Sequence, residues 1–213
     1  MNKEEVFELD NFNETTIELI KMQKSKHLIF SSYFSKETFD LTKLLQFSNT
    51  LEKLSLRGSN YTNLEKMFNE MPKLTYINVD TQKIDFSLIA ENSTIEYLAS
   101  EGTRTKEWAG ITKLKNLKTL HINGNITLDN IDFLTEFENL ENLELWNCSK
   151  ITKIPDLSSL TKLKRISMEM CNRLEDISEV KKLENVKINI SGKMIKGGYH
   201  NTTLADALAG ASL

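Results

Sequence analysis

One spacing of aliphatic residues recurs along most of the chain. A copy has aliphatic residues at its first, fourth and sixth positions, as in Leu51, Leu54 and Leu56, and a weaker copy at Ile95 has Ser100 at the sixth. The copies begin at positions 51, 74, 95, 117, 140, 163 and 183, so they follow one another in steps of 20 to 23 residues. A repeat of this period predicts a solenoid, in which successive coils stack and bury one continuous core.

The fourth and sixth positions of each copy predict a β-strand. Residues two apart lie on the same face of a strand, so both aliphatic side chains face the core and the residues beside them face outward. The strands of successive coils are expected to form one parallel sheet that lines the concave side. Between the strands lie short apolar segments, which predict 3₁₀ turns, loops and short helices on the convex side. The expected fold class is therefore α/β, in the form of a solenoid.

The two ends of the chain depart from the repeat, which divides the chain into three parts. Residues 1–24 are predicted to form an N-terminal cap that contains a short helix over residues 14–23, with Asn13 as its N-cap. Residues 25–190 form the solenoid, whose first strand directs Leu28 and Phe30 inward. Residues 191–213 form a C-terminal cap or tail. Two alternatives stay open for this part: it is an added segment, or it marks a point of truncation.

Two runs carry a resemblance to a known family. The first run is Leu114-x-x-Leu117-x-x-Leu120-x-Ile122-x-x-Asn125-x-x-Leu128. The second run is Leu143-x-Leu145-x-x-Cys148-x-x-Ile151-x-x-Ile154-Pro155-Asp156-Leu157-Ser158. The first resembles the internalin-like bacterial type of leucine-rich repeat, and the second is similar to coils of plant disease-resistance receptors. The resemblance implies a curved array that most often binds proteins, and less often carbohydrates, lipids or nucleic acids. The copy at Ile95 departs from the family pattern at Ser100 and Thr103, so a distorted coil is expected there.

The composition narrows the range of partners. The net charge is −3 and lysines are interspersed with glutamates along the chain, which disfavours nucleic acid as a partner. The acidic N-terminus has no basic and apolar signal region, and no apolar run has the length of a membrane span. We therefore expect a cytoplasmic protein, monomeric and without a membrane partner, although a leader removed earlier is an open alternative.

The two cysteines lie one repeat apart. Cys148 and Cys171 both follow the sixth position of their copies by three residues, and Asn125 has the equivalent place. Such residues turn inward at the end of the strand. Because neighbouring coils stack at about 4.8 Å, the two sulfur atoms should be neighbours. Buried reduced thiols are the expected state, and a disulfide is the geometric alternative.

The outward positions of the strands hold the candidate binding residues. Aromatic residues dominate binding hot spots, and acidic residues concentrate in the middle coils, which favours a protein partner with a basic segment. The alternation places Tyr76 beside Tyr97, and it aligns Asp80, Glu101, Asn123, Trp146 and Glu169 in one row. The predicted partner-binding residues are Tyr76, Asp80, Tyr97, Glu101, His121, Glu144, Trp146 and Glu169.

The sequence predicts a binding protein rather than an enzyme. The histidines His27, His121 and His200 lie far apart, and both cysteines occupy inward positions, where an activated thiolate is not expected. We predict no catalytic residues, no metal site and no cofactor. A bacterial cytoplasmic adaptor or a toxin-neutralising protein fits this description. The alternatives are a carbohydrate-binding module and the targeting domain of a larger effector enzyme.

Overall fold

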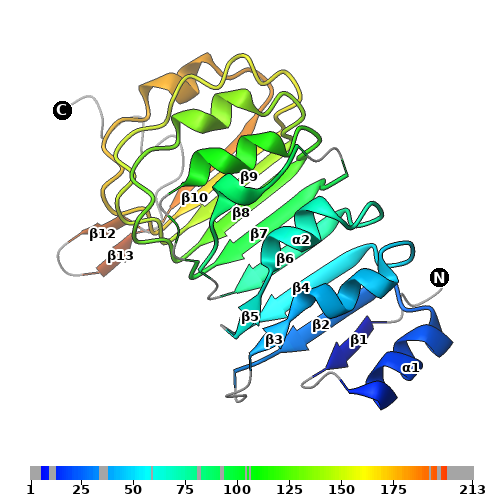
Figure 1. Cartoon of the computed structure of the whole chain (residues 1–213). Helices are drawn as coiled ribbons and strands as arrows, with labels where there is room; N and C mark the ends of the chain where they lie inside the picture. The colour runs from blue at the N-terminus through cyan, green and yellow to red at the C-terminus, as the bar shows by residue number, and fades with distance from the viewer. Residues whose placement is uncertain are drawn as a thin grey trace.

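A nine-stranded parallel sheet runs through the whole molecule. The computed structural model describes residues 6–9, 13–33, 38–58, 60–80, 83–91, 94–103, 105, 107–191, 193–195 and 198–200. The sheet takes its strands in chain order, and each pairs in parallel with the next along the curved face in Figure 1. The strands are β1 (Val6–Leu9), β2 (His27–Ser31), β4 (Lys53–Arg57), β6 (Tyr76–Asp80), β7 (Tyr97–Glu101), β8 (Thr119–Asn123), β9 (Asn142–Trp146), β10 (Arg165–Glu169) and β11 (Lys187–Ser191). The predicted solenoid is thus confirmed.

Short helical segments line the opposite, convex side (Figure 1). Helix α2 (Leu64–Asn69) ends before Pro72 and buries Leu64, Met67 and Phe68. The return that contains Pro155 forms no helix over residues 151–163, because proline cannot continue a helix. The 3₁₀ helices are Leu41–Phe47, Phe86–Leu88, Trp108–Lys113, Asp132–Glu136 and Ser178–Lys182. No helix in the described ranges is both long enough and apolar enough to span a membrane.

The N-terminal helix follows its predicted bounds. Helix α1 (Glu14–Gln23) begins at Asn13, whose side chain accepts a hydrogen bond from the Thr16 backbone N–H at 3.0 Å. Thr16 Oγ1 in turn accepts from the Asn13 N–H at 2.8 Å, which completes a capping box. The helix buries Ile20 and packs beside β1 at the first end of the sheet (Figure 1). Strand β1 extends the sheet by one strand beyond the expected first strand, β2.

Strand alternation builds the core. Leu54 and Leu56, and likewise Leu143 and Leu145, are at most 1% exposed, while the residues between and beside them line the other face. The returns add a second apolar row that includes Phe86 and Leu134. Each coil therefore buries residues from its strand and from its return against the next coil, as a solenoid requires.

The last coil has a different register from the predicted one. The spacing places Val186 opposite Ile166, but in the structure Ile188 pairs with Ile166 and Ile190 with Met168. The repeat step is thus 188−166=22 residues instead of 20, and Asn185 takes the first position, which holds leucine or isoleucine in the other copies. Lys187 and Asn189 keep their outward direction, because a shift of two residues preserves the face of a strand.

The coil at Ile95 is regular in its strand, contrary to the expected distortion. Strand β7 pairs over all five residues with both β6 and β8, so Ser100 lies between Val79 and Ile122 in the core. Ser100 is fully buried, and its hydroxyl has no hydrogen-bond partner among the described residues. The pairing of the backbone on both sides holds the strand in place despite this unfavourable buried hydroxyl.

Two small sheets lie outside the main one. Strand β3 (Phe39–Asp40) pairs in parallel with β5 (Tyr61–Thr62), and β12 (Lys193–Ile195) pairs antiparallel with β13 (Gly198–His200). The described part of the C-terminal region is therefore a hairpin. Residues 201–213 of the predicted C-terminal cap or tail lie outside the described residues. The three-part division of the chain stays a prediction.

Candidate functional site: the concave face of strands β6 to β10

The pairing of the strands aligns the outward side chains in rows. Tyr76 pairs with Tyr97, and Asp80 pairs with Glu101. The latter row continues through Asn123 and Trp146 to Glu169, as the alternation predicts. A second row runs through Ala99, His121, Glu144 and Ser167. The sequence-predicted site residues are thus all on one face of the sheet.

The two tyrosines form a stack at the amino-terminal edge of this face. The ring centroids of Tyr76 and Tyr97 lie 4.3 Å apart, and the ring planes differ by 12°. The ring of His27 lies 5.9 Å from that of Tyr76 and is tilted by 58°. Burial, followed by the neighbouring Tyr76 and Glu144, raises the pKa of Tyr97 to about 12. Tyr97 therefore stays a neutral phenol at physiological pH.

Two carboxylates face one another at the other edge of the same strands. Asp80 and Glu101 are direct neighbours in the register of β6 and β7. Burial, with a further contribution from the charge of Glu101, raises the pKa of Asp80. Two like charges at this spacing repel each other, so a cation placed between them would be favoured.

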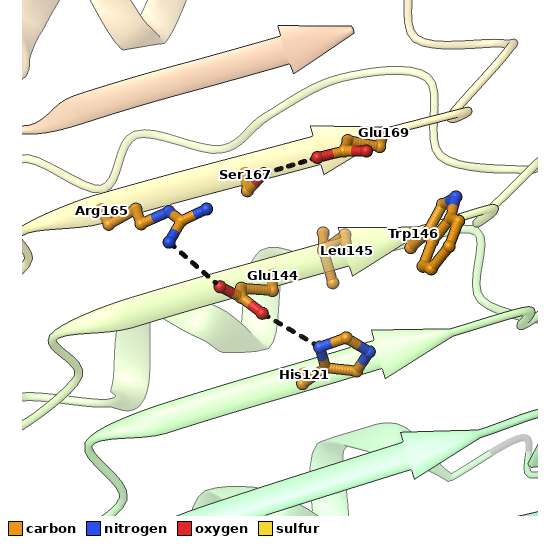
Figure 2. Close-up of a pocket in the computed structure, with 7 residues that line it drawn as sticks. All are labelled: His121, Glu144, Leu145, Trp146, Arg165, Ser167 and Glu169. Carbon is orange, nitrogen blue, oxygen red and sulfur yellow. Dashed lines mark hydrogen bonds and ion pairs between the residues drawn. The ribbon is translucent and has the colours of Figure 1, made fainter. Parts of the chain in front are cut away.

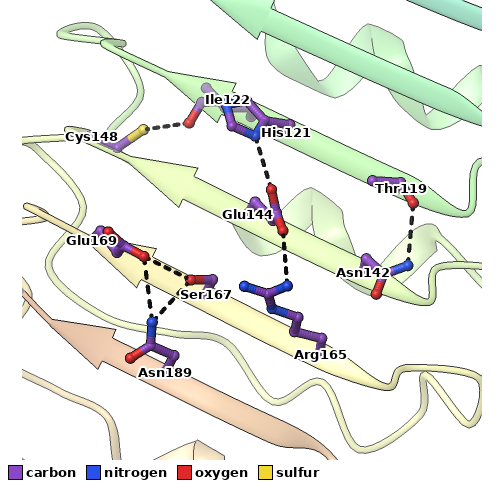
Figure 3. A network of polar contacts seen from close by, with 10 residues as sticks. All are labelled: Thr119, His121, Ile122, Asn142, Glu144, Cys148, Arg165, Ser167, Glu169 and Asn189. Atoms are coloured by element: carbon purple, nitrogen blue, oxygen red, sulfur yellow. Dashed lines mark hydrogen bonds and ion pairs between the residues drawn. The ribbon is translucent and has the colours of Figure 1, made fainter. Parts of the chain in front are cut away.

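A charged network crosses the middle of the face. His121 Nδ1 lies 3.1 Å from Glu144 Oε2, and Arg165 Nη1 lies 3.6 Å from Glu144 Oε1 (Figure 3). One carboxylate therefore joins side chains from β8, β9 and β10. Arg165, which is not among the predicted binding residues, therefore offsets part of the negative charge of Glu144.

A shallow depression of about 250 Å³ lies beside this network. Its lining residues are His121, Glu144, Leu145, Trp146, Arg165, Ser167 and Glu169 (Figure 2). Leu145 is buried beneath the face, whereas the indole of Trp146 is 46% exposed at the end of β9. Glu169 Oε1 is 3.4 Å from both Ser167 Oγ and Asn189 Nδ2, and neither group carries a charge.

Met170 completes the surroundings of Trp146. The indole Nε1–H donates a hydrogen bond to the Met170 sulfur, at an N···S distance of 2.9 Å. Met170 has a φ angle of 57°, in the left-handed region. The equivalent turn residues of three other coils are Gly58, Gly102 and Gly124, and Asn147 occupies the turn after β9. Methionine at such a position is strained, because its Cβ crowds the backbone.

The predicted residues divide into two groups. The depression brings together four of them, His121, Glu144, Trp146 and Glu169. Tyr76, Asp80, Tyr97 and Glu101 lie on β6 and β7, outside the depression. The predicted set of partner-binding residues did not include Arg165, Ser167 and Met170. Arg165 and Ser167 were recognisable as outward residues of the adjacent strand, whereas the contact of Met170 depends on its unusual turn conformation.

The two thiols lie beneath the same edge of the sheet. Cys148 and Cys171 are free and buried. Their sulfur atoms lie 3.8 Å from the carbonyl oxygens of Ile122 and Leu145, respectively. Interaction with Cys171, followed by burial, raises the pKa of the Cys148 thiol. The expected reduced ladder is therefore present, and Cys148 is a protonated thiol at neutral pH.

The histidine and the serine of this face each contact a carboxylate. The hydroxyl of Ser167 contacts Glu169, whereas His121 contacts Glu144, so these two residues are not paired with each other. A contact between a histidine and a serine lies on the neighbouring strands β2 and β4, where His27 Nε2 is 3.5 Å from Ser55 Oγ. A serine nucleophile requires an adjacent base. Acidic and aromatic side chains from successive strands instead form an open, rigid surface that can contact a partner.

Comparisons with known proteins identify the repeat. Residues 138–182 match the family model described as Leucine Rich repeats (2 copies). Over 128 residues the chain is 24% identical to a disease-resistance protein of Arabidopsis thaliana, and this match covers 58% of the chain and 12% of that protein.

Two solved structures that are similar to the chain come from bacteria. An internalin C2 structure from Listeria monocytogenes is 20% identical, with a TM-score of 0.53, and the match covers 76% of this chain and 80% of that one. A leucine-rich repeat protein of Leptospira interrogans is 14% identical, with a TM-score of 0.39, over 86% of this chain and 65% of that one. The likeness to internalin C2 supports the fold observed here.

Proposed function

We propose that this leucine-rich repeat protein binds another protein through the concave face of strands β6 to β10. Leucine-rich repeat proteins generally mediate protein–protein interactions. The parallel sheet provides a rigid surface, because each of the strands β6 to β10 is fixed by hydrogen bonds to a neighbour on both sides. Rigid surfaces lose little conformational entropy on binding, which favours affinity.

The exposed indole of Trp146 is the observation that carries the proposal. Large apolar side chains on strands usually pack against neighbours, but Trp146 is 46% exposed at the edge of a depression. Tryptophan is among the residues most enriched in binding hot spots. Covering this indole with a partner would bury apolar surface that water now contacts.

The charges of the face favour a partner with a basic segment. Asp80, Glu101 and Glu169 lie along one row with Trp146. Arg165 faces this region from β10 and pairs with Glu144. A complementary basic segment would accelerate association and orient the partner. An adaptor or a toxin-neutralising protein would use the face in this way, and we propose that class of role.

The carbohydrate alternative receives less support from the aromatic geometry. Tyr76 and Tyr97 stack on one another, so each covers a ring face that a sugar would need. Trp146 lies in a different row, two strands away from Tyr97. The three rings therefore do not form one continuous platform for stacking.

Affinity capture with matched variants tests the proposal. The purified chain, Trp146→Ala and the convex control Lys153→Ala are each immobilised and exposed to an extract of the cells that produce the protein. We expect a partner that binds wild type and Lys153→Ala equally and Trp146→Ala at least tenfold more weakly. The melting temperature should be nearly the same for all three proteins. Equal capture by all three would exclude the concave face.

A further inference from the structure

We propose that Trp146, Met170 and Glu169 form a subsite that receives one arginine or lysine side chain of the protein partner. This inference rests on the proposed function and specifies which chemical group the partner inserts. The three residues come from the ends of two adjacent strands, since Trp146 and Glu169 are direct neighbours in the register of β9 and β10. Met170 follows Glu169 and contacts the indole (Figure 2 shows Trp146 and Glu169).

Of the two carboxylates that line the depression, one has cationic partners in the described part of the chain and the other does not. Glu144 is already bridged by His121 and Arg165. Glu169 contacts only the neutral groups of Ser167 and Asn189, and it has no ion pair among the described residues. Those two donors hold one carboxylate oxygen, which leaves the other oxygen for a cation. The carboxylate of Glu169 can therefore form an ion pair with a guanidinium or ammonium group that enters the depression.

The apolar wall fits the stem of a long cationic side chain. The indole of Trp146 offers its exposed face, and a cation above an aromatic face is stabilised by the ring quadrupole. Arginine and lysine also have methylene stems that pack on apolar surface while the charged end reaches a carboxylate. Trp146 and Met170 provide the surface for the stem, and Glu169 provides the charge for the end.

The conformation of Met170 is independent support for this site. A left-handed φ angle of 57° is unfavourable for methionine, and glycine occupies the equivalent turn in three coils. The strained conformation places the thioether against the indole N–H. Strained residues cluster at binding sites, where they hold neighbouring groups in one arrangement. Met170 is thus a positioning residue that fixes the exposed orientation of Trp146.

A peptide selection tests which chemical group enters the subsite. The full chain and its Glu169→Gln variant are immobilised separately, and a random-peptide phage library is selected on each. Glutamine keeps the size of the side chain and an acceptor oxygen, so the fold is preserved. We expect peptides enriched in arginine or lysine on the wild type and loss of that enrichment on Glu169→Gln.

Calorimetry on the most enriched basic peptide then quantifies the subsite. Glu169→Gln should weaken binding by about tenfold and reduce its salt dependence, because a charge-assisted contact is lost. Trp146→Ala should weaken the binding of the same peptide by a similar factor. The matched control is Glu136→Gln, which removes an exposed carboxylate from a convex 3₁₀ helix and should leave the affinity unchanged.

Two results would overturn the subsite. The first is a set of peptides that depend on Trp146 but contain no excess of basic residues or bind Glu169→Gln equally well. That result would leave the proposed concave binding intact. The second is the absence of any peptide that depends on Trp146, in which case the capture experiment alone decides the proposed function.

Discussion

At the residue scale, the direction of each side chain on the concave face follows from strand alternation, whereas the contacts between these side chains do not. The sequence was sufficient to predict that Trp146 and Glu144 point outward, because alternation in a strand leaves no other choice once Leu143 and Leu145 are buried. It was not sufficient to predict that Arg165 neutralises Glu144. That contact depends on the rotamers of two long side chains, and the repeat pattern does not specify rotamers.

Replacing Met170 with glycine should stabilise the protein. The left-handed conformation of Met170 costs about 1–2 kcal/mol, which glycine would relieve. The unfolded chain gains about 0.4–1 kcal/mol of conformational freedom from the new glycine. We therefore expect the free energy of unfolding, measured by urea denaturation, to rise by about 0.5–1 kcal/mol.

Asn147→Gly is the matched control for Met170→Gly. Asn147 lies at the equivalent turn of the preceding coil with a φ angle of 53°, and asparagine tolerates this region better than methionine does. Its replacement should stabilise the protein less. A lower free energy of unfolding for Met170→Gly than for wild type would mean that packing of the thioether on Trp146 outweighs the strain.

At the element scale, the convex returns share a turn that the aliphatic repeat does not reveal. In four coils an aspartate accepts a hydrogen bond from the backbone N–H two residues later: Asp40 from Thr42, Asp85 from Ser87, Asp156 from Ser158 and Asp176 from Ser178. These Asx turns start the convex segments and satisfy their first N–H groups. The spacing Asp-x-Ser/Thr in the sequence could have indicated them.

The aspartate turns should make the protein sensitive to acid. Hydrogen bonds to Ser158 and then to Lys182 hold the pKa of Asp156 well below its ordinary value, and hydrogen bonds also lower the pKa of Asp40, Asp85 and Asp176. A carboxylate with a depressed folded-state pKa stabilises the protein above the unfolded pKa, near 3.8. This contribution is lost as the pH falls through the folded-state value.

Urea denaturation at a series of pH values measures this loss. The free energy of unfolding should be nearly constant above about pH 5 and should fall steeply below about pH 4. Asp156→Asn should reduce the slope in the acidic range, because one of the four groups no longer titrates. Asp80 opposes the trend, since burial raises its pKa, but it is a single group. A slope that is unchanged by Asp156→Asn would exclude this turn as an acid-sensitive element.

At the scale of the whole molecule, the repeat predicts most of the architecture. The period defines the order of the strands, and their alternation defines the concave rows from Tyr76 to Glu169. The last coil was placed two residues off because Leu183 and Val186 imitate the aliphatic spacing. Pairing with β10 overrides that local pattern, since Ile188 and Ile190 continue the inward rows of Ile166 and Met168.

The buried thiols report on unfolding of the solenoid as a whole. Cys148 and Cys171 lie in adjacent coils near the middle of the second half of the chain, and both are at most 6% exposed. Burial protects each thiol from reagents, and only the thiolate reacts quickly. The pKa of Cys148 is raised by interaction with Cys171 and by burial, so native Cys148 should be almost inert. We expect labelling by a thiol reagent to be slow in the native protein.

The dependence of labelling on denaturant distinguishes global from local opening. In a solenoid each coil is stabilised by its neighbours, so coils in the interior should open together with the rest of the chain. Labelling of both thiols should accelerate with urea in parallel with loss of the circular dichroism signal. A Cys148→Ala variant reports Cys171 alone and should show the same dependence. Fast labelling in the absence of urea would show that the coils from β9 to β10 open independently of the remaining sheet.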